Sequence, residues 1–309
     1  MPLVAALAAL IAGISLGAFF GRYWWVLDLA ANFRAHMTVV LVGAAVVLAL
    51  GRWPRTALTI ALVGAISAAA VLPLFVGPAS RPATFDLRVM SFNLLSDNAE
   101  FDEVIGFIAA ELPDVVLLHE ASRPWEEALA ESQLGYEITR GRNEGLIFGT
   151  LVLAPTGSEV VSFGFDVSDA RAIEIVLPSG VAILGIHPLA PFPDDQTERR
   201  RYQFEFASLW AASRSGSKII VGDFNASPWS YSFRRLRMET GLRNSQAGFG
   251  LELSYPAGAN PLLQVSIDHL LHSADLAVVD RRLGPALGSD HLPLTVDLSL
   301  VDQTANPGL

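Results

Sequence analysis

The sequence contains no cysteine, and this absence removes a set of chemistries from consideration. Disulfide bridges, zinc-thiolate sites and thiol nucleophiles all need that side chain. The absence does not fix the compartment, because a domain without disulfides is viable on either side of a membrane. Internal repeats and low-complexity tracts are also absent. Any reactive centre in this chain therefore depends on oxygen and imidazole groups.

Charge is nearly absent from the first 80 residues. They contain neither Lys nor Glu, and only four Arg and one Asp. The other 17 basic and 30 acidic residues lie in residues 81–309, which therefore carry a net charge of −13 against +3 for the first 80. The overall hydrophobic content of 51% is high for a soluble protein, and the excess is concentrated in the uncharged segment.

Three apolar runs follow one another in this segment, at residues 2–20, 35–51 and 57–77. A membrane-spanning helix needs about 20 apolar residues. The first and third runs reach that length, whereas the second does so only when Ala35 and His36 are counted. The aromatic residues 23–25 lie between the first two runs, where an interfacial belt is expected. We predict three transmembrane helices that form a membrane anchor over residues 1–80.

Two other interpretations of the anchor stay open, a cleaved signal peptide at the first run and a buried helical hairpin in a soluble protein. No Lys or Arg precedes the first run and two more runs follow it, which argues against a signal peptide. Three spans place the amino terminus and the C-terminal domain on opposite sides of the membrane. The basic residues favour a cytoplasmic domain, with two on the far side (Arg52 and Arg55) and four on the domain side (Arg22, Arg34, Arg81 and Arg88).

Beyond a linker at residues 81–86, the pattern changes to short β-type runs separated by helical stretches. Helical periodicity fits residues 100–111 and 198–213. Seven runs are predicted to be strands, at 87–93, 114–120, 172–177, 181–187, 218–223, 266–272 and 293–300. The sequence thus predicts one α/β domain over residues 87–300, followed by a tail at 301–309.

Polar side chains able to bind metal or phosphate lie at the ends of several predicted strands, namely Asn93, Glu120, His187, Asp223, Asn225, Asp268, Asp290 and His291. Ligands of α/β proteins gather outside strand ends. Each residue alone also has a plain structural interpretation, as a turn former, a cap or a hydrogen-bonded histidine. Together, the oxygen donors suit Mg²⁺ or Mn²⁺, and the histidines suit contact with phosphate. The set predicts metal-assisted hydrolysis of a phosphoester.

Six motifs carry these residues in chain order: "SFNL" (91–94), "DVVLLHE" (114–120), "GIHP" (185–188), "GDFNASP" (222–228), "SIDHLL" (266–271) and "GSDHLPL" (288–294). In this order they resemble the endonuclease/exonuclease/phosphatase superfamily. The resemblance implies a deoxyribonuclease-like fold, a four-layer α-β-β-α sandwich, which here follows three transmembrane helices. It also implies a Mg²⁺-dependent hydrolase that acts on phosphate ester bonds.

The resemblance further implies which residues hold the metal. Glu120 would be the principal ligand, with Asn93 and Asp290 close to the ion. His119 stands where the family usually has Gln. Strand alternation is expected to point its side chain away from that of Glu120, which favours a packing role.

The remaining site residues are implied to act on water and phosphate. Asp223 would orient or deprotonate the attacking water, and Asn225 would hydrogen-bond the phosphate. His291 would contact a phosphate oxygen, with Asp268 fixing its tautomer and orientation. His187 would be a second histidine on the phosphate. These donors stabilise the charge that develops on phosphoryl oxygens.

Some features depart from the family pattern or have no assigned role. Residues 144–160 no longer match a segment that is common in the family, so the contribution of that segment is open. Arg171 either approaches the phosphate or lies on the surface. We interpret three arginine clusters as solvated faces or loops, at 199–201, 234–237 and 281–282.

The substrate is less well defined than the reaction. A net charge of −13 disfavours a nucleic acid, whose phosphates attract basic surfaces. The three-span arrangement resembles that of glycopeptide-resistance-associated membrane proteins, whose active domains are thought to face outward and to act on lipid-linked phosphates. This resemblance conflicts with the count of basic residues, and we follow the resemblance. We expect a multi-pass protein of the cell membrane, partnered with the bilayer, with an extracytoplasmic domain acting on a lipid or lipid-linked phosphate. A membrane-tethered nuclease and a non-catalytic binding protein are the alternatives.

Overall fold

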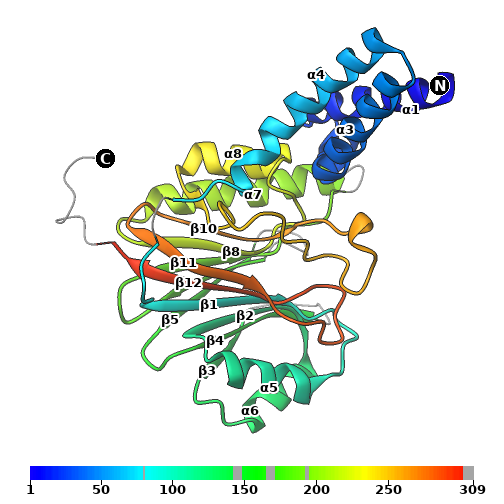
Figure 1. The fold of residues 1–309 in the computed structure, drawn as a ribbon. Coiled ribbons are helices and arrows are strands. Elements are labelled where there is room, and N and C mark those ends of the chain that lie inside the picture. The colour runs from blue at the N-terminus through cyan, green and yellow to red at the C-terminus, as the bar shows by residue number, and fades with distance from the viewer. Residues whose placement is uncertain (79–80, 142–147, 165–170, 192–194, 302–309) are drawn as a thin grey trace.

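A bundle of apolar helices precedes two stacked β-sheets whose outer faces carry further helices (Figure 1). This computed structural model describes residues 1–78, 81–141, 148–164, 171–191 and 195–301. Residues 302–309 of the predicted tail at 301–309, and residues 144–147 of the unmatched segment, lie outside the described residues. The first strand begins at Leu87 and the last ends at Leu300.

The amino-terminal bundle is built from α1 (Pro2–Gly17), α2 (Trp25–Ala31), α3 (Arg34–Leu50) and α4 (Pro54–Val71), with single turns at Ala18–Phe20 and Leu72–Leu74. Alanines such as Ala8, Ala12 and Ala45 lie buried where α1, α3 and α4 meet. Small side chains let helix backbones approach closely. Many of the larger aliphatic side chains of the bundle are exposed instead, among them Leu10, Val46, Leu50, Leu58 and Leu62.

Two stretches of the bundle, Pro2–Phe20 and Pro54–Leu74, are long enough and apolar enough to cross a membrane. The second predicted span, residues 35–51, coincides with α3, whose 17 residues do not meet the same criteria alone. It meets them only together with α2, which joins it at a bend of 70°. The described residues therefore contain two candidate spans, or three if the bent pair acts as one. The break has a physical reason, since the amide oxygen of Asn32 accepts a hydrogen bond from Ser227 N (2.9 Å) in the folded domain.

The C-terminal domain contains two six-stranded sheets. The first has the order β11 (Leu276–Leu283), β12 (Leu294–Leu300), β1 (Leu87–Asn93), β2 (Val115–Ser122), β4 (Phe148–Ala154) and β3 (Glu137–Arg140). The second has the order β5 (Glu159–Gly164), β6 (Arg171–Val176), β7 (Ala182–Ile186), β8 (Lys218–Asp223), β10 (Asp268–His272) and β9 (Arg243–Asn244). Only the β1–β2 and β7–β8 pairs are parallel among the described strands. All seven predicted strands are present, whereas β3, β4, β5, β9 and β11 were not predicted.

The layers follow from the burial of both faces of each sheet. In β8, Ile219 and Val221 belong to the core between the sheets, while Ile220 belongs to the core under the outer helices. Those helices are α7 (Asp195–Ser213) and α8 (Tyr231–Thr240), and α5 (Phe101–Glu111) and α6 (Arg123–Glu131) cover the other sheet. A strand buried on both faces reads as a continuous apolar run. The result is the expected α-β-β-α order of layers.

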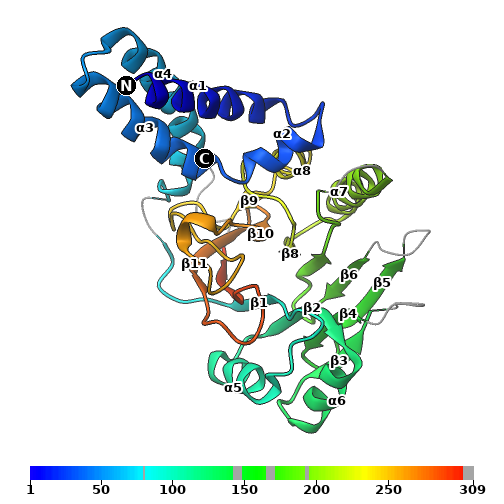
Figure 2. The same ribbon diagram turned by 90° about the vertical axis from the view of Figure 1, so that its right-hand side faces the viewer.

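The bundle packs against the domain on the side of α7 and α8, as the view turned by 90° also shows (Figure 2). Trp229 lies in a buried cluster with bundle residues such as Ala31 and Val71, and its indole N–H donates to Ala70 O (3.0 Å). Leu74 O accepts hydrogen bonds from Gly248 N and Gly250 N, both at 2.8 Å. The ends of α1 and α4 and the start of α3 therefore lie at the domain, and their other ends point away from it.

Candidate active site

The carboxyl ends of two parallel strand pairs meet between the sheets, because β1 and β2 lie against β8. Asn93 is the last residue of β1, Asp223 is the last residue of β8, and His187 follows β7. Glu120 lies two residues before the end of β2. Side chains at such positions emerge from rigid backbone into one shared space.

Asn93 links the two sheets across this space. Its amide nitrogen donates to Glu120 Oε1 (3.1 Å) and to Asp223 Oδ2 (3.2 Å). Its amide oxygen accepts from Leu95 N (3.1 Å), which fixes the orientation of the side chain. Asn93 and Asp223 are almost fully buried, whereas the Glu120 side chain is partly exposed.

The Asp223 carboxylate lies between two imidazole rings. Its Oδ2 is 3.3 Å from His187 Nε2 and 3.6 Å from His291 Nε2. Burial alone would raise the pKa of Asp223, but the charges and hydrogen bonds of these two histidines bring it well below its usual value. Asp223 is therefore ionised at neutral pH and can accept hydrogen bonds from groups in the site.

His291 is held by a second buried carboxylate. Its Nδ1 lies 2.9 Å from Asp268 Oδ2, and its ring packs on Tyr255 with 4.7 Å between ring centroids. Burial would lower the pKa of His291, but the charges of Asp268 and Asp223 raise it to about 10. His291 is thus a cation at neutral pH, with Nε2 turned toward the shared space.

Asn225 makes a turn that also shapes the site. Its backbone has a φ of 48°, and its N–H donates to Asp223 Oδ1 (2.8 Å). Its side-chain nitrogen donates to Pro188 O (3.1 Å), next to His187. The turn interpretation and the site interpretation of this residue are therefore compatible, since the turn ties the loop after β8 to the loop after β7.

The structure brings seven of the eight predicted residues into one hydrogen-bonded or closely spaced group. The eighth, Asp290, is partly buried at its edge, and its carboxylate helps to raise the pKa of His291. Burial and the charges of Asp290, Asp223 and Glu120 also raise the pKa of Tyr255. Tyr255 therefore stands among these carboxylates, a position that no sequence motif indicated.

The donor set fits a hard divalent cation such as Mg²⁺. Carboxylate and amide oxygens are the ligands such ions take, and no Lys or Arg of the described residues forms an ion pair with Glu120, Asp223, Asp268 or Asp290. One cluster with metal-ligand spacing is Asp223, Asp268 and His291, but the short Asp268–His291 hydrogen bond already occupies two of its donor atoms. The more open Glu120, with Asn93 and Asp290 nearby, leaves room for the waters that Mg²⁺ retains.

The backbone conformation of Glu120 differs from that of a regular strand, in which side chains simply alternate between the two faces. Its φ is 54°, and the pairing of β2 with β4 shifts register between Leu118 and Ala121, as at a β-bulge. His119 is buried, with Nδ1 3.3 Å from Thr150 Oγ1 and its ring 5.5 Å from that of His187. The packing role predicted for His119 agrees with this burial, but the residue packs directly beneath the site rather than away from it.

Two arginines that the sequence placed on solvated faces are buried beneath the site. Arg200 is 4% exposed, and its guanidinium donates to Phe224 O (3.2 Å) and Asn225 O (3.0 Å). Arg281 is 3% exposed and donates to Asp268 O (3.2 Å). The prediction was wrong for these two positions. The Nη atoms of Arg200 donate to backbone carbonyls near the site, and Arg281 pairs with Glu252 and also donates to Ser245 Oγ. For Arg171, only its place at the start of β6 is described.

Protonation of His291 predicts how stability depends on pH. The pKa of His291 is about 10 in the folded protein against about 6.5 when unfolded, so the folded state binds this proton more tightly. Its contribution is complete below about pH 6.5 and is lost as the pH rises toward 10, by at most about 1.4 kcal/mol per pH unit. Denaturant unfolding of metal-free protein across this pH range measures the slope. In His291→Gln the alkaline slope should flatten, and an unchanged slope would contradict the assignment.

The two-sheet fold and the buried Asp, His and Asn cluster define a class of phosphoesterase-like α/β domains. A family model of the Endonuclease/Exonuclease/phosphatase family matches residues 90–291. The chain belongs to this family. Among curated proteins, none matches the sequence.

Solved structures share the fold over about 70% of this chain. Truncated TDP2 from Caenorhabditis elegans is 17% identical, with a TM-score of 0.55 over 69% of this chain and 97% of that one. The 3′ phosphatase NExo from Neisseria, bound to a product DNA hairpin, is 20% identical, with a TM-score of 0.58 over 69% and 100%. A mannosyl-6-phosphatase from Bacteroides thetaiotaomicron is 16% identical, with a TM-score of 0.53 over 70% and 100%. At these identities the likeness shows the fold alone.

Proposed function

We propose that the protein is a membrane-anchored, metal-dependent phosphoester hydrolase whose substrate is a lipid or lipid-linked phosphate. The charge arrangement supports hydrolysis, because a cationic His291 and an anionic Asp223 face one space. The cation at Nε2 is suited to a phosphate oxygen, and the carboxylate is suited to a water molecule. Since its pKa is far below its usual value, Asp223 is a weak base in this state and is better suited to orienting the water.

A divalent cation held by Glu120 and Asp290, with Asn93 beside them, would supply neutralisation of the phosphate charge. Asp268 holds the His291 ring through its 2.9 Å contact with Nδ1, which leaves Nε2 for the substrate. His187, 3.3 Å from Asp223, is placed to donate a second hydrogen bond. Such fixed donors stabilise charge as it develops on phosphoryl oxygens.

The observation that carries the lipid substrate is a contact between the rim of the site and the anchor. The segment 255–265, here called the rim loop, begins at Tyr255 on the His291 ring. It then reaches α3, where Pro261 O lies 3.4 Å from His36 Nε2. Its tip presents two adjacent leucines, Leu262 (72% exposed) and Leu263 (64% exposed). A phosphoester held in the bilayer surface would therefore lie close to the catalytic groups.

A comparison of substrates in one preparation tests this proposal. Full-length protein in vesicles is given Mg²⁺ and either a phospholipid or polyprenyl phosphate in the bilayer, a short water-soluble phosphoester, or DNA. We expect the bilayer substrate to be turned over fastest. Equal turnover of soluble and bilayer-held esters would count against the lipid substrate, and preferential cleavage of DNA would favour the nuclease alternative.

The rim loop gives a sharper prediction. The double variant Leu262→Asp/Leu263→Asp should lower turnover of the bilayer substrate about tenfold or more, because two apolar side chains lose favourable burial at the bilayer surface, worth roughly 1.5–3 kcal/mol for each fully buried leucine. Turnover of the soluble ester should stay unchanged. The matched control is Leu112→Asp, equally exposed at 72% but directly after α5, at the end of the domain away from the anchor (Figure 1). Equal losses for both substrates would contradict a role in membrane contact.

A further inference from the structure

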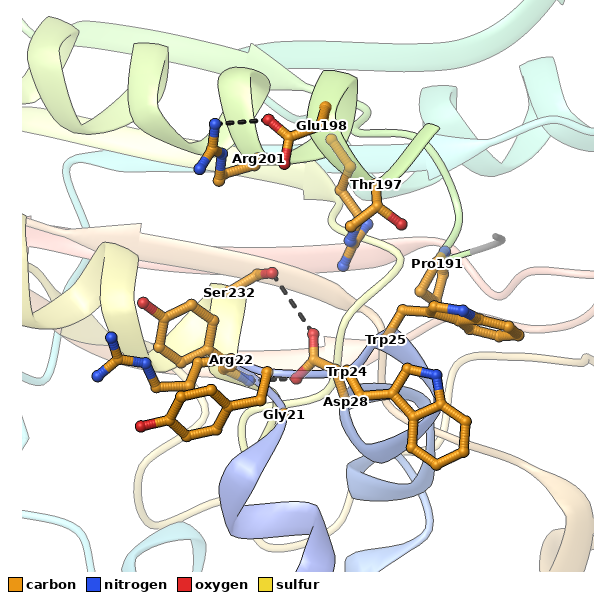
Figure 3. A pocket seen from close by; sticks show the side chains of 13 residues that line it. Gly21, Arg22, Trp24, Trp25, Asp28, Pro191, Thr197, Glu198, Arg201 and Ser232 are labelled. Carbon is orange, nitrogen blue, oxygen red and sulfur yellow. Dashed lines mark hydrogen bonds and ion pairs between the residues drawn. The ribbon is translucent and has the colours of Figure 1, made fainter. Parts of the chain in front are cut away.

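A second polar site lies where the anchor meets the domain. A pocket of about 330 Å³ is enclosed by residues 21–25 and Asp28 of the bundle, by the first turns of α7 and by the start of α8. Figure 3 shows the indoles of Trp24 and Trp25 on one side and the Glu198–Arg201 pair on another. The pocket therefore combines the aromatic belt residues of the anchor with charged residues of the domain.

The acidic groups of the pocket already have partners. Asp28 accepts a hydrogen bond from Tyr231 N at the start of α8, and its other oxygen lies 3.5 Å from Ser232 Oγ. Glu198 forms an ion pair with Arg201 at 2.5 Å. Arg22, by contrast, forms no ion pair within the described part of the chain, and its guanidinium lies 4.9 Å from the centre of the Tyr23 ring. Among the described residues, one positive charge of the pocket is thus without an ion-pair partner.

A second arginine, whose charge lies near those of Asp28 and Asp223, is in the wall of the pocket. Arg200 lines it while remaining 4% exposed, and its Nη atoms bind carbonyls of the loop after β8. Its Nε has no hydrogen-bond partner among the described residues. Because a buried N–H without an acceptor destabilises the fold, an acceptor oxygen bound in the pocket would be favoured at this position.

Two further arginines lie at the junction, outside the lining of the pocket. Arg34, at the start of α3, is 1% exposed, and its Nε and Nη2 have no partner within the described ranges. The charge of Arg234, in α8, acts on it from nearby. The junction therefore has an excess of arginine over carboxylate, although residues 81–309 as a whole carry −13.

We propose that this junction pocket binds the phosphate of an anionic membrane phospholipid, at a site separate from the catalytic centre. The ligand chemistry is a phosphate oxygen facing guanidinium groups, with the indoles of Trp24 and Trp25 beside the glycerol and upper acyl region. Basic and aromatic side chains at the ends of membrane helices suit anionic headgroups. The position of the pocket at the domain-side end of α1 favours a lipid over a soluble phosphate.

Occupancy of the pocket would also bear on the catalytic loop. Arg200 contacts both the pocket and the carbonyls of Phe224 and Asn225. A phosphate that fixes Arg200 from the pocket side would steady the backbone that presents Asp223. The site would thus bind a structural lipid whether or not a lipid is also the substrate.

Lipid retention by the full-length protein tests the proposal without any turnover. Detergent-solubilised protein is titrated with phosphatidylglycerol, and bound lipid is counted by native mass spectrometry. The double variant Arg22→Ala/Arg201→Ala should retain about tenfold less of this lipid. Both side chains are exposed, so the variant should fold. Diacylglycerol, which lacks the phosphate, should bind weakly to the unmodified protein, and equal retention of the two lipids would overturn a phosphate site.

Three controls keep the result interpretable. Arg52→Ala/Arg55→Ala removes two arginines from the far end of the bundle and should leave retention unchanged; an equal loss there would mean only general charge attraction. His291→Ala should also leave retention unchanged, and a loss would place the lipid in the catalytic centre. Inorganic phosphate should not displace the lipid at millimolar concentration; displacement would overturn a lipid headgroup as the ligand. None of these outcomes depends on the proposed hydrolysis.

Discussion

Replacing Asp223 with asparagine is expected to reduce phosphoester hydrolysis by about 10²-fold or more, the order typical when a reacting group, here the attacking water, loses its orientation. Asparagine has nearly the same shape, and with its amide oxygen in the place of Oδ2 it keeps the hydrogen bond from Asn93, whereas the Asn225 N–H loses its acceptor at Oδ1. What is lost is the negative charge between the two histidines, 3.3 Å from His187 and 3.6 Å from His291. Turnover of the preferred ester under saturating Mg²⁺ measures the loss.

The same variant has a readout that a purely structural role would not give. Asp223 is one of the two carboxylates that chiefly hold the pKa of His291 at about 10. In Asp223→Asn that pKa should fall, which NMR titration of the ring protons can follow. The control is Asp280→Asn, because Asp280 is a partly exposed carboxylate of the same domain, paired with Arg282. Activity retained in Asp223→Asn would end the catalytic assignment of Asp223, whereas a lack of turnover by the unmodified protein would favour a binding protein.

The sequence predicts the strands that are buried on both faces and end in a functional group. β1 and β8 follow this pattern, with Asn93 and Asp223 at their ends, and β10 begins with Asp268. For these strands the sequence pattern is enough to predict where the candidate site residues lie. Strand β4 also has a buried apolar core, at Leu151, Val152 and Leu153, but it lies in the segment that departs from the family pattern. Its pairing with both β2 and β3 depends on tertiary contacts, which local periodicity does not contain.

Other parts of the site depend on contacts between distant segments. Arg200 lies in a run of three arginines, a composition typical of a solvated helix face, yet it is enclosed because it faces the carbonyls of a loop 24 residues away. Tyr255 has no motif, and only the fold places it on His291. The division between α2 and α3 similarly follows from hydrogen bonds of Asp28 and Asn32 to the domain. Sequence patterns identify the polar side chains of the site, but the fold determines which distant residues contact them.

Gly222 illustrates a residue whose identity the site requires. Its φ is 147°, and a Cβ at this position would lie 2.0 Å from Ile186 O and 2.9 Å from His119 Nε2. Ile186 is the last residue of β7, which pairs with β8 through Gly185 and Val221. Ile186 O cannot move away from such a methyl group without breaking the pairing of β7 with β8. These two strands position His187 and Asp223. The glycine in the motif is therefore demanded by a close backbone approach.

Gly222→Ala should consequently lower the free energy of unfolding by about 4 kcal/mol or more, which is exceptional for one methyl group, and should abolish hydrolysis. Gly216→Ala is the matched control, because Gly216 also has positive φ (75°) but no described atom lies within 4 Å of the position that its methyl group would take. That variant carries only the backbone strain of a left-handed residue, about 1–2 kcal/mol, and should stay active. The difference between the two variants, measured by denaturant unfolding, isolates the clash with Ile186 O. Equal destabilisation would mean that backbone strain alone, and not the packing of β7 against β8, explains the glycine.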